Sequence, residues 1–149
     1  MADRTESSIV VDAAPGDVLD VIADFDAYPD WTGAVRQAEV LEEDEDGWAR
    51  TVRFVLDAGA LRDTYTLAYT WDFAEDGTGT VTWTLVEAGI LKAMDGSYRL
   101  RADPGRDATE VTYTLSVEVK MPMLGMLRRK AEKTIIDTAL KELKKRAEG

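Results

Sequence analysis

The chain has 149 residues, of which 45% are hydrophobic and 32% are charged, a composition typical of one globular domain and unlike that of a disordered chain. Its 18 basic and 29 acidic side chains give a formal net charge of −11, which argues against nucleic acid as a partner. The absence of cysteine and histidine excludes disulfides, thiolate nucleophiles, histidine-based triads and metal sites built on Cys or His ligands.

No stretch of the sequence is suited to crossing a membrane. The longest segment without a charge is residues 77–86, whereas a transmembrane helix needs about twenty apolar residues. No basic-then-apolar leader opens the chain, so we expect a cytoplasmic protein. No linker or repeat is visible, and residues 1–149 are predicted to form a single ligand-binding domain.

The first thirty residues combine a strand with a helical corner. Residues 5–13 predict a strand, and Pro15 follows at a position that the first turn of a helix tolerates. Residues 18–22 supply a short apolar helical stripe. Residues 24–31 (DFDAYPDW) predict a second short helical turn that is broken by Pro29.

Downstream of this corner, the hydrophobic period changes to two. In residues 64–73, aromatic residues and leucine alternate with threonine and other small or polar residues. Similar alternation predicts five further strands, over residues 35–43, 48–57, 80–87, 94–102 and 111–120. This pattern is typical of an antiparallel sheet with one covered face and one threonine-rich face in water.

The last segment predicts one long helix over residues 122–147. Its apolar residues fall on a single stripe with a period of 3.6. A sheet with one dry face needs a cover, and this helix is the only element long enough to supply it. We therefore predict an α+β fold in which a curved, seven-stranded antiparallel sheet wraps around the C-terminal helix, with two short helices after the first strand.

The predicted dry face holds eight of the twelve aromatic residues, including Trp48 and Trp71. Aromatic residues with a polar tip line many ligand cavities, but they also pack in ordinary cores, and both interpretations stay open. The methionine-rich segment 121–127 is an adaptable surface that could form the cavity mouth. The candidate ligand-binding residues are Phe54, Tyr65, Leu67, Tyr69, Trp83, Leu85, Tyr98, Tyr113, Met123, Leu124 and Leu127.

Few titratable side chains are candidates for catalysis. Arg50, beside Trp48, and Glu87, beside Leu85, are the charged residues that alternation places on the inner face. We expect them at opposite ends of the sheet, where each reaches water, although an apolar cavity could make Glu87 a lone general base. Gly96, inside a predicted strand, favours a close approach by the helix. No cofactor or metal is predicted, and the acidic run 39–46 lacks the ligand pattern of a calcium loop.

Three segments resemble a known family. These are DFDAYPDWTGAVRQAEVL (24–41), TWTLVEAGILKAMDGSYRL (82–100) and EVKMPMLGMLRRKAEKTIIDTALKELKKR (118–146). With its Tyr-Pro-x-Trp corner, the whole chain is similar to the START-like, helix-grip superfamily, and more narrowly to the bacterial polyketide cyclase/dehydrase and lipid transport family. The resemblance implies the fold derived above, and it implies either a carrier of hydrophobic molecules or an aromatase/cyclase.

These observations leave three functional hypotheses. The first is non-covalent binding or transport of a hydrophobic small molecule such as a lipid, isoprenoid, quinone or polyketide. The second is a polyketide aromatase/cyclase or dehydratase. The third is presentation of a ligand to a membrane or protein, because residues 128–149 carry eight basic and four acidic side chains. The docking face would then be Arg128, Arg129, Lys130 and Lys133, although a solvated helix face explains the same charges.

Overall fold

The computed structural model describes residues 4–57, 62–105, 107–120 and 125–149, and the side chains of residues 125–128 fall outside the description. In chain order, the elements are β1 (Thr5–Val11), α1 (Pro15–Ala23), the short 3-10 turn η1 (Phe25–Ala27), α2 (Tyr28–Trp31), β2 (Val35–Glu43), β3 (Ala49–Asp57), β4 (Arg62–Phe73), β5 (Gly79–Ala88), β6 (Leu91–Ala102), β7 (Thr109–Val119) and α3 (Gly125–Glu148).

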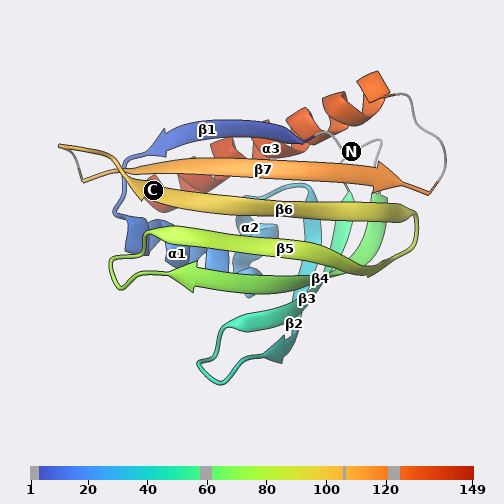
Figure 1. Cartoon of the computed structure of the whole chain (residues 1–149), viewed down its shortest axis with the longest axis horizontal. Coiled ribbons are helices and arrows are strands. Elements are labelled where there is room, and N and C mark those ends of the chain that lie inside the picture. The colour runs from blue at the N-terminus through green and yellow to red at the C-terminus, as the bar shows by residue number, and fades with distance from the viewer. Residues whose placement is uncertain (1–3, 58–61, 106, 121–124) are drawn as a thin grey trace.

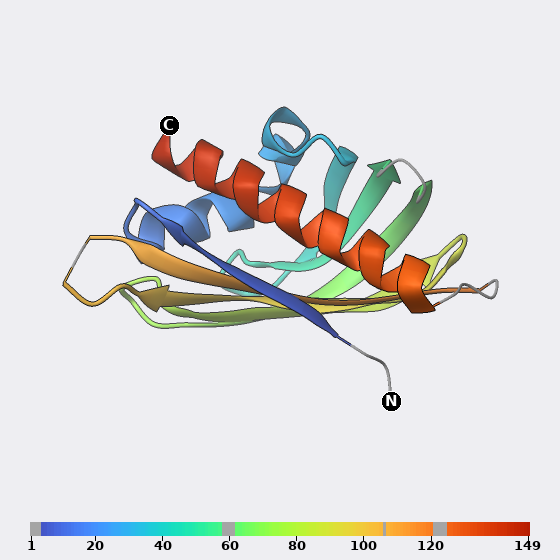
Figure 2. The ribbon, with the colours of Figure 1, turned by 90° about the horizontal axis from the view of Figure 1, so that it is seen from above.

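The strands form one antiparallel sheet in the order β1-β7-β6-β5-β4-β3-β2 (Figure 1). The sheet curves, and α3 crosses its concave side (Figure 2). Helix α3 packs mainly on β1 and β7, while α2 packs on β2 at the opposite edge. The predicted α+β helix-grip fold is therefore confirmed. No helix in the described ranges carries a run of apolar residues sufficient to traverse a bilayer.

The predicted elements differ from the observed ones mainly at their ends. The first strand stops at Val11, and the sixth begins at Leu91, three residues before the predicted start. Pro29 does not break the second helical turn as we expected, because it lies in the first turn of α2, where no intrahelical N–H bond is lost. The expected helix start at residue 122 lies outside the described residues.

Alternation along the strands places one set of side chains in the core. In β3, Val52, Phe54 and Leu56 are buried, and exposed or partly exposed residues lie between them. The same alternation recurs in β5 and β7, and the buried residues form one continuous hydrophobic cluster with α1, α2 and α3. Each fully buried large apolar side chain contributes about 1.5–3 kcal/mol relative to an exposed one. Burial of this inner face thus holds the helices against the sheet.

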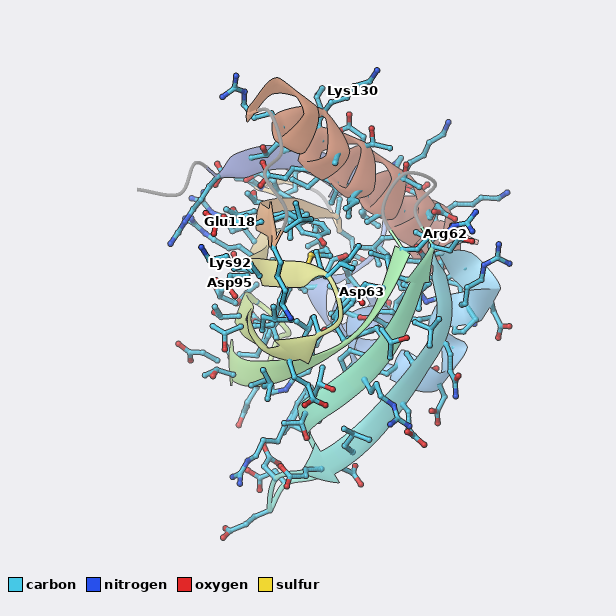
Figure 3. The ribbon with its side chains drawn as sticks, turned by 90° about the vertical axis from the view of Figure 1, so that its right-hand side faces the viewer. Arg62, Asp63, Lys92, Asp95, Glu118 and Lys130 are labelled. Atoms are coloured by element: carbon cyan, nitrogen blue, oxygen red, sulfur yellow. The ribbon has the colours of Figure 1, made fainter. Side chains whose placement is uncertain are left out.

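One hairpin of the sheet is held by carboxylates at its end. The β5–β6 ladder pairs residues 79–83 with residues 96–100, and the two strands are not paired beyond these positions. There the Asp95 carboxylate accepts a hydrogen bond from a backbone N–H of β5 at 3.0 Å. The Asp63 carboxylate, from β4, accepts bonds from the three successive N–H groups of residues 89–91 at 2.9–3.0 Å (Figure 3). Side chains therefore satisfy backbone donors that the ladder leaves unpaired.

A buried glutamate ties α3 to the sheet. Glu132 has no exposed surface, and its two carboxylate oxygens accept hydrogen bonds from Thr5 Oγ1 at 2.7 Å and from the Val117 backbone N–H at 2.6 Å. Strand β1 begins at Thr5, opposite Leu115, so Val117 lies beyond the end of that pairing. Glu132 therefore supplies the acceptor that a neighbouring strand would otherwise give to β7. It lies on the same buried face of α3 as the apolar residues Ile136 and Leu140.

Replacement of Glu132 by alanine is expected to lower the free energy of unfolding by about 1–3 kcal/mol, because it leaves a buried N–H without an acceptor. Chemical denaturation monitored by circular dichroism measures the change. The matched control is Thr134→Ala, an exposed site on the same helix, where we expect a change within about 0.5 kcal/mol. Equal stability of the two variants would contradict the anchoring role of Glu132.

Candidate functional site

A cavity of about 80 Å³ lies between the inner face of the sheet, the α2 corner and α3. Strands β3, β4, β5, β6 and β7 contribute aromatic and aliphatic side chains to it, and α3 contributes Ile135, Thr138 and Ala139. None of the described lining residues is an Asp, Glu, Lys or Arg. The cavity is thus an apolar space, and the polar side-chain groups of its described lining residues are hydroxyls and the indole N–H groups of Trp31 and Trp83.

The aromatic side chains around the cavity form a continuous wall because their rings contact one another. Tyr98 and Tyr113 have ring centroids 4.6 Å apart, and both rings contact Trp83 at 5.4–5.6 Å. Trp83 lies 5.8 Å from Tyr69, which continues the wall toward the α2 corner. Tilted and edge-on contacts of this kind stabilise each pair by about 0.5–1.5 kcal/mol beyond burial, so the wall is a fixed surface.

The tyrosine hydroxyls differ in how they are satisfied. The Tyr28 hydroxyl donates a hydrogen bond to the Ile22 carbonyl oxygen at 2.5 Å. The hydroxyls of the other four tyrosines make no hydrogen bond to any residue within the described part of the chain. These four are Tyr65, Tyr69, Tyr98 and Tyr113, and all of them line the cavity. These hydroxyls are therefore available to form hydrogen bonds with a molecule in the cavity.

An indole N–H adds a fifth donor of this kind. Trp31 is 9% exposed, and its Nε1 atom is buried with no acceptor among the described residues. By contrast, the Nε1 atom of Trp71, a neighbour in the same aromatic cluster, donates to the Ala49 carbonyl oxygen at 2.7 Å. Trp31 also lines the cavity. These five donors of the site have no acceptor within the described residues, and none of the described lining residues is charged.

Burial keeps these phenols in their neutral, proton-donating form. Burial raises the pKa of Tyr65 and Tyr113 well above the ordinary value, and for Tyr65 the nearby Tyr113 adds to the shift. The pKa values of Tyr69 and Tyr98 are also raised, first by burial and then by neighbouring tyrosines. At neutral pH the cavity can donate hydrogen bonds to oxygen, but these tyrosines cannot act as bases.

Most of the candidate wall residues lie around this cavity. The structure places seven of them there: Phe54, Tyr65, Leu67, Tyr69, Trp83, Tyr98 and Tyr113. Leu85 is partly buried and packs on the core without lining the cavity, because the β5–β6 ladder opens beside it. Met123 and Leu124 lie outside the described residues, and so does the side chain of Leu127.

The two charged candidates are not part of the site. Arg50 and Glu87 are both exposed, and neither lines the cavity, so their predicted inward orientation was wrong. Their predicted position at opposite ends of the sheet also needs correction. Glu87 pairs with Thr66, and Thr51, next to Arg50, pairs with Ala68, so the two charges flank the middle of β4.

Sequence reasoning missed the cavity residues that come from the helices. Tyr28 and Trp31 belong to the Tyr-Pro-x-Trp corner, which we used to recognise the fold but not to build the site. Ile135 belongs to the apolar stripe of α3. The stripe indicates which face of the helix packs on the sheet, but it does not show where a cavity remains between the two. Met94 was within a predicted strand, but no register was available to place it.

Gly96 permits a close approach, although not by the helix. A Cβ atom at this position would lie 2.7 Å from the Trp83 ring and 2.5 Å from the Thr114 carbonyl oxygen. Gly96 and Trp83 are cross-strand partners, so the indole lies over the glycine. The absence of a side chain at Gly96 therefore leaves room for the Trp83 ring, which forms part of the cavity wall. Our expectation that the helix approaches Gly96 was wrong.

The cavity is small for a ligand site. Its 80 Å³ has room for a few water molecules, whereas sites for drug-sized ligands enclose about 300–1,000 Å³. A hydrophobic ligand of that size must displace side chains or part of the α2 corner when it enters. The arrangement can hold a neutral molecule with oxygen acceptors, but it has no acid–base pair of charged groups.

Comparisons with known proteins agree with this architecture. A family model described as polyketide cyclase/dehydrase and lipid transport matches residues 11–144. A START superfamily protein from Mycobacterium smegmatis has a TM-score of 0.87 at 21% identity, and the similarity covers 97% of each chain. The Zhui aromatase/cyclase from Streptomyces sp. R1128 has a TM-score of 0.75 at 20% identity, over 99% of this chain and 94% of that one. At these identities, the structural likeness establishes the fold alone.

The raised pKa values predict how the protein responds to alkali. An unfolded tyrosine ionises near pH 10, so the stability that the buried tyrosines contribute is fully present below that pH. It is lost as the pH rises from about 10 toward the higher pKa values of the folded state. We expect tyrosinate absorbance to remain low at pH 10 and then to rise together with the loss of circular dichroism. Full ionisation at pH 10 in a folded protein would contradict the burial of these hydroxyls.

Proposed function

Because the chain belongs to the polyketide cyclase/dehydrase and lipid transport family, we propose that it binds a hydrophobic small molecule with carbonyl or other oxygen acceptors non-covalently in the aromatic cavity. The observation that carries the proposal is the set of unpartnered donors, namely four tyrosine hydroxyls and the Trp31 indole N–H, around one apolar space. An apolar wall buries the body of such a ligand, and a few placed donors orient it.

The donors favour one chemical class within the family's range. A saturated acyl chain or isoprenoid offers no acceptor along its length, so it would leave the hydroxyls as unsatisfied as an empty cavity does. A polyketide, quinone or similar aromatic ketone carries oxygens at several positions around a flat or folded carbon frame. Such a frame also suits the aromatic wall of Tyr98, Trp83 and Tyr113, whose faces and edges can pack on rings.

Catalysis on the same ligand class is the second candidate function, and the neutral tyrosines are the observation that favours it. Hydrogen-bond donors aimed at a carbonyl oxygen stabilise the enolate that forms when a poly-β-ketone cyclises. The described lining residues include no carboxylate or amine to remove the proton, so we place binding first. Formation of a cyclised product from a poly-β-ketone on incubation with the protein would reverse that order.

A matched pair of ligands tests the proposed hydrogen bonds. 2-Acetylnaphthalene and 2-ethylnaphthalene share a ring system and shape, but only the ketone can accept a hydrogen bond. We expect the wild-type protein to bind the ketone more tightly. Tyr98→Phe or Tyr113→Phe is expected to reduce this preference by roughly two- to tenfold, the value of one hydrogen bond, while binding of the hydrocarbon is unchanged. Titration calorimetry or fluorescence measures both affinities.

Tyr28→Phe is the matched control, because the Tyr28 hydroxyl already donates to the Ile22 carbonyl oxygen. This variant should lose about 1 kcal/mol of stability and keep the ketone preference of the wild type. Tyr98→Phe should show the reverse, namely a reduced ketone preference in a free protein at least as stable as the wild type, because the change removes a hydroxyl that has no partner within the described residues. Equal affinity of the wild type for ketone and hydrocarbon would overturn the proposal that the hydroxyls recognise oxygen.

A further inference from the structure

A second concave surface lies directly outside the cavity, between α2 and the last turns of α3. Asp30 and Trp31 line it on the α2 side, and three cations line it on the α3 side, Lys141, Lys145 and Arg146. We call this surface the basic groove. Figure 2 shows the C-terminal end of α3 beside the short helices, and contacts between α2 and α3 confirm that they are neighbours.

The cations of the basic groove are exposed and have no carboxylate partner within the described part of the chain. Two other cations of α3 are occupied, since Lys133 pairs with Asp137 at 3.2 Å and Lys144 donates to the Val10 carbonyl oxygen at 3.0 Å. A protein with a net charge of −11 thus concentrates three unpaired positive charges in one groove. Cations without an ion-pair partner can each contact an anionic group directly.

Two carboxylates share the groove with these cations, so its side chains carry three positive and two negative charges. The Glu142 carboxylate, on the α3 side, accepts a hydrogen bond from the Gly33 backbone N–H at 3.0 Å. This bond joins α3 to the turn after α2 and holds the two walls of the groove together. Asp30 is exposed on the opposite wall and makes no ion pair within the described residues. The three cations therefore remain available to a ligand.

One side chain separates the groove from the cavity. Trp31 lines both spaces, and its Nε1 atom is the buried donor that has no acceptor. Its ring packs edge-on against that of Tyr28, with the ring centroids 5.0 Å apart. The cavity alone is too small for a ring-sized ligand, and displacement of this indole would join it to the groove.

We propose that the basic groove is a subsite for an anionic group on the ligand of the cavity. The ligand is then an amphiphile, with an oxygenated hydrophobic body inside the fold and a carboxylate, phosphate or sulfonate held by Lys141, Lys145 and Arg146. It enters past Trp31, which moves to connect the two spaces. This inference rests on the proposed function, because it assigns the second half of the same ligand.

Two fluorescent probes that differ only by a sulfonate test the subsite. 8-Anilinonaphthalene-1-sulfonate carries the negative charge, and N-phenyl-1-naphthylamine is the same ring system without it. In the variant Lys141→Gln/Lys145→Gln/Arg146→Gln, we expect the sulfonate probe to bind roughly five- to tenfold more weakly, because three surface charge contacts are lost. The neutral probe should bind within about twofold of its wild-type affinity, and added salt should weaken only the sulfonate probe in the wild type.

The matched control variant is Lys92→Gln/Arg99→Gln/Lys130→Gln, which removes the same charge from exposed sites away from the groove. Lys92 and Lys130 lie at the end of the molecule shown in Figure 3. The control should keep both affinities within about twofold. An equal loss of sulfonate binding in both variants would overturn the subsite, because it would reflect net charge alone.

Two further outcomes separate the subsite from the cavity. If the neutral probe binds the wild type but the sulfonate probe is indifferent to the groove substitutions, the subsite fails and the cavity proposal stands. If the neutral probe does not bind the wild type at all, the cavity proposal fails. The sulfonate probe should also displace the neutral one competitively. Simultaneous binding of both probes would contradict the proposal that one ligand spans the cavity and the groove.

Discussion

A hydroxyl or N–H group that is removed from water and given no acceptor costs about 1–3 kcal/mol, and this cost governs the interior of the protein. The Trp31 Nε1 atom is such a group, and four tyrosines whose hydroxyls make no hydrogen bond within the described residues line the same apolar space. Phenylalanine could fill the four tyrosine positions with the same ring and without the cost. In the function that we propose, the oxygen atoms of a ligand accept hydrogen bonds from these hydroxyls, and the ring contacts around them keep the donors in place.

The shape of the fold explains why a cavity exists here. One helix is about 10–12 Å wide with its side chains, whereas seven strands at about 4.8 Å spacing make a sheet much wider than that. Helix α3 packs on β1 and β7, where Glu132 anchors it. The far strands curve toward the α2 corner, and the space between the two covers is closed by aromatic side chains. Helices α2 and α3 contact each other there, and Trp31 lines the cavity at this junction.

The sequence predicted the fold well because its signals were local and periodic. Alternation in β4 indicates which face of the sheet is apolar, and the stripe of α3 indicates which face of the helix is apolar. Because both faces must be buried, the helix is predicted to pack on the sheet. The wall residues on the strands followed from the same alternation. Arg50 and Glu87 show the limit, because alternation assigns a face but not whether a strand end is enclosed or open to water.

The other missing features depend on contacts between distant segments. Glu132 is a charged residue within an apolar stripe. The Val117 backbone N–H requires a side-chain acceptor because the pairing of β1 with β7 ends at Thr5 and Leu115. Tyr28 and Trp31 reach the cavity because η1 and α2 turn the chain across the sheet edge. The unpartnered state of a hydroxyl has no sequence signal at all, since Tyr28 and Tyr98 look alike until the Ile22 carbonyl oxygen is located beside one of them.

The most direct test of the account is to locate a bound ketone by intermolecular nuclear Overhauser effects. With 2-acetylnaphthalene at saturating concentration, the account predicts contacts from the ligand to Tyr98, Tyr113, Met94 and Ile135, which lie on different elements around the cavity. The contacts should define one bound position inside the fold. Contacts confined to the threonine-rich outer face, or the absence of any saturable binding, would contradict the claim that this cavity recognises an oxygenated hydrophobic ligand.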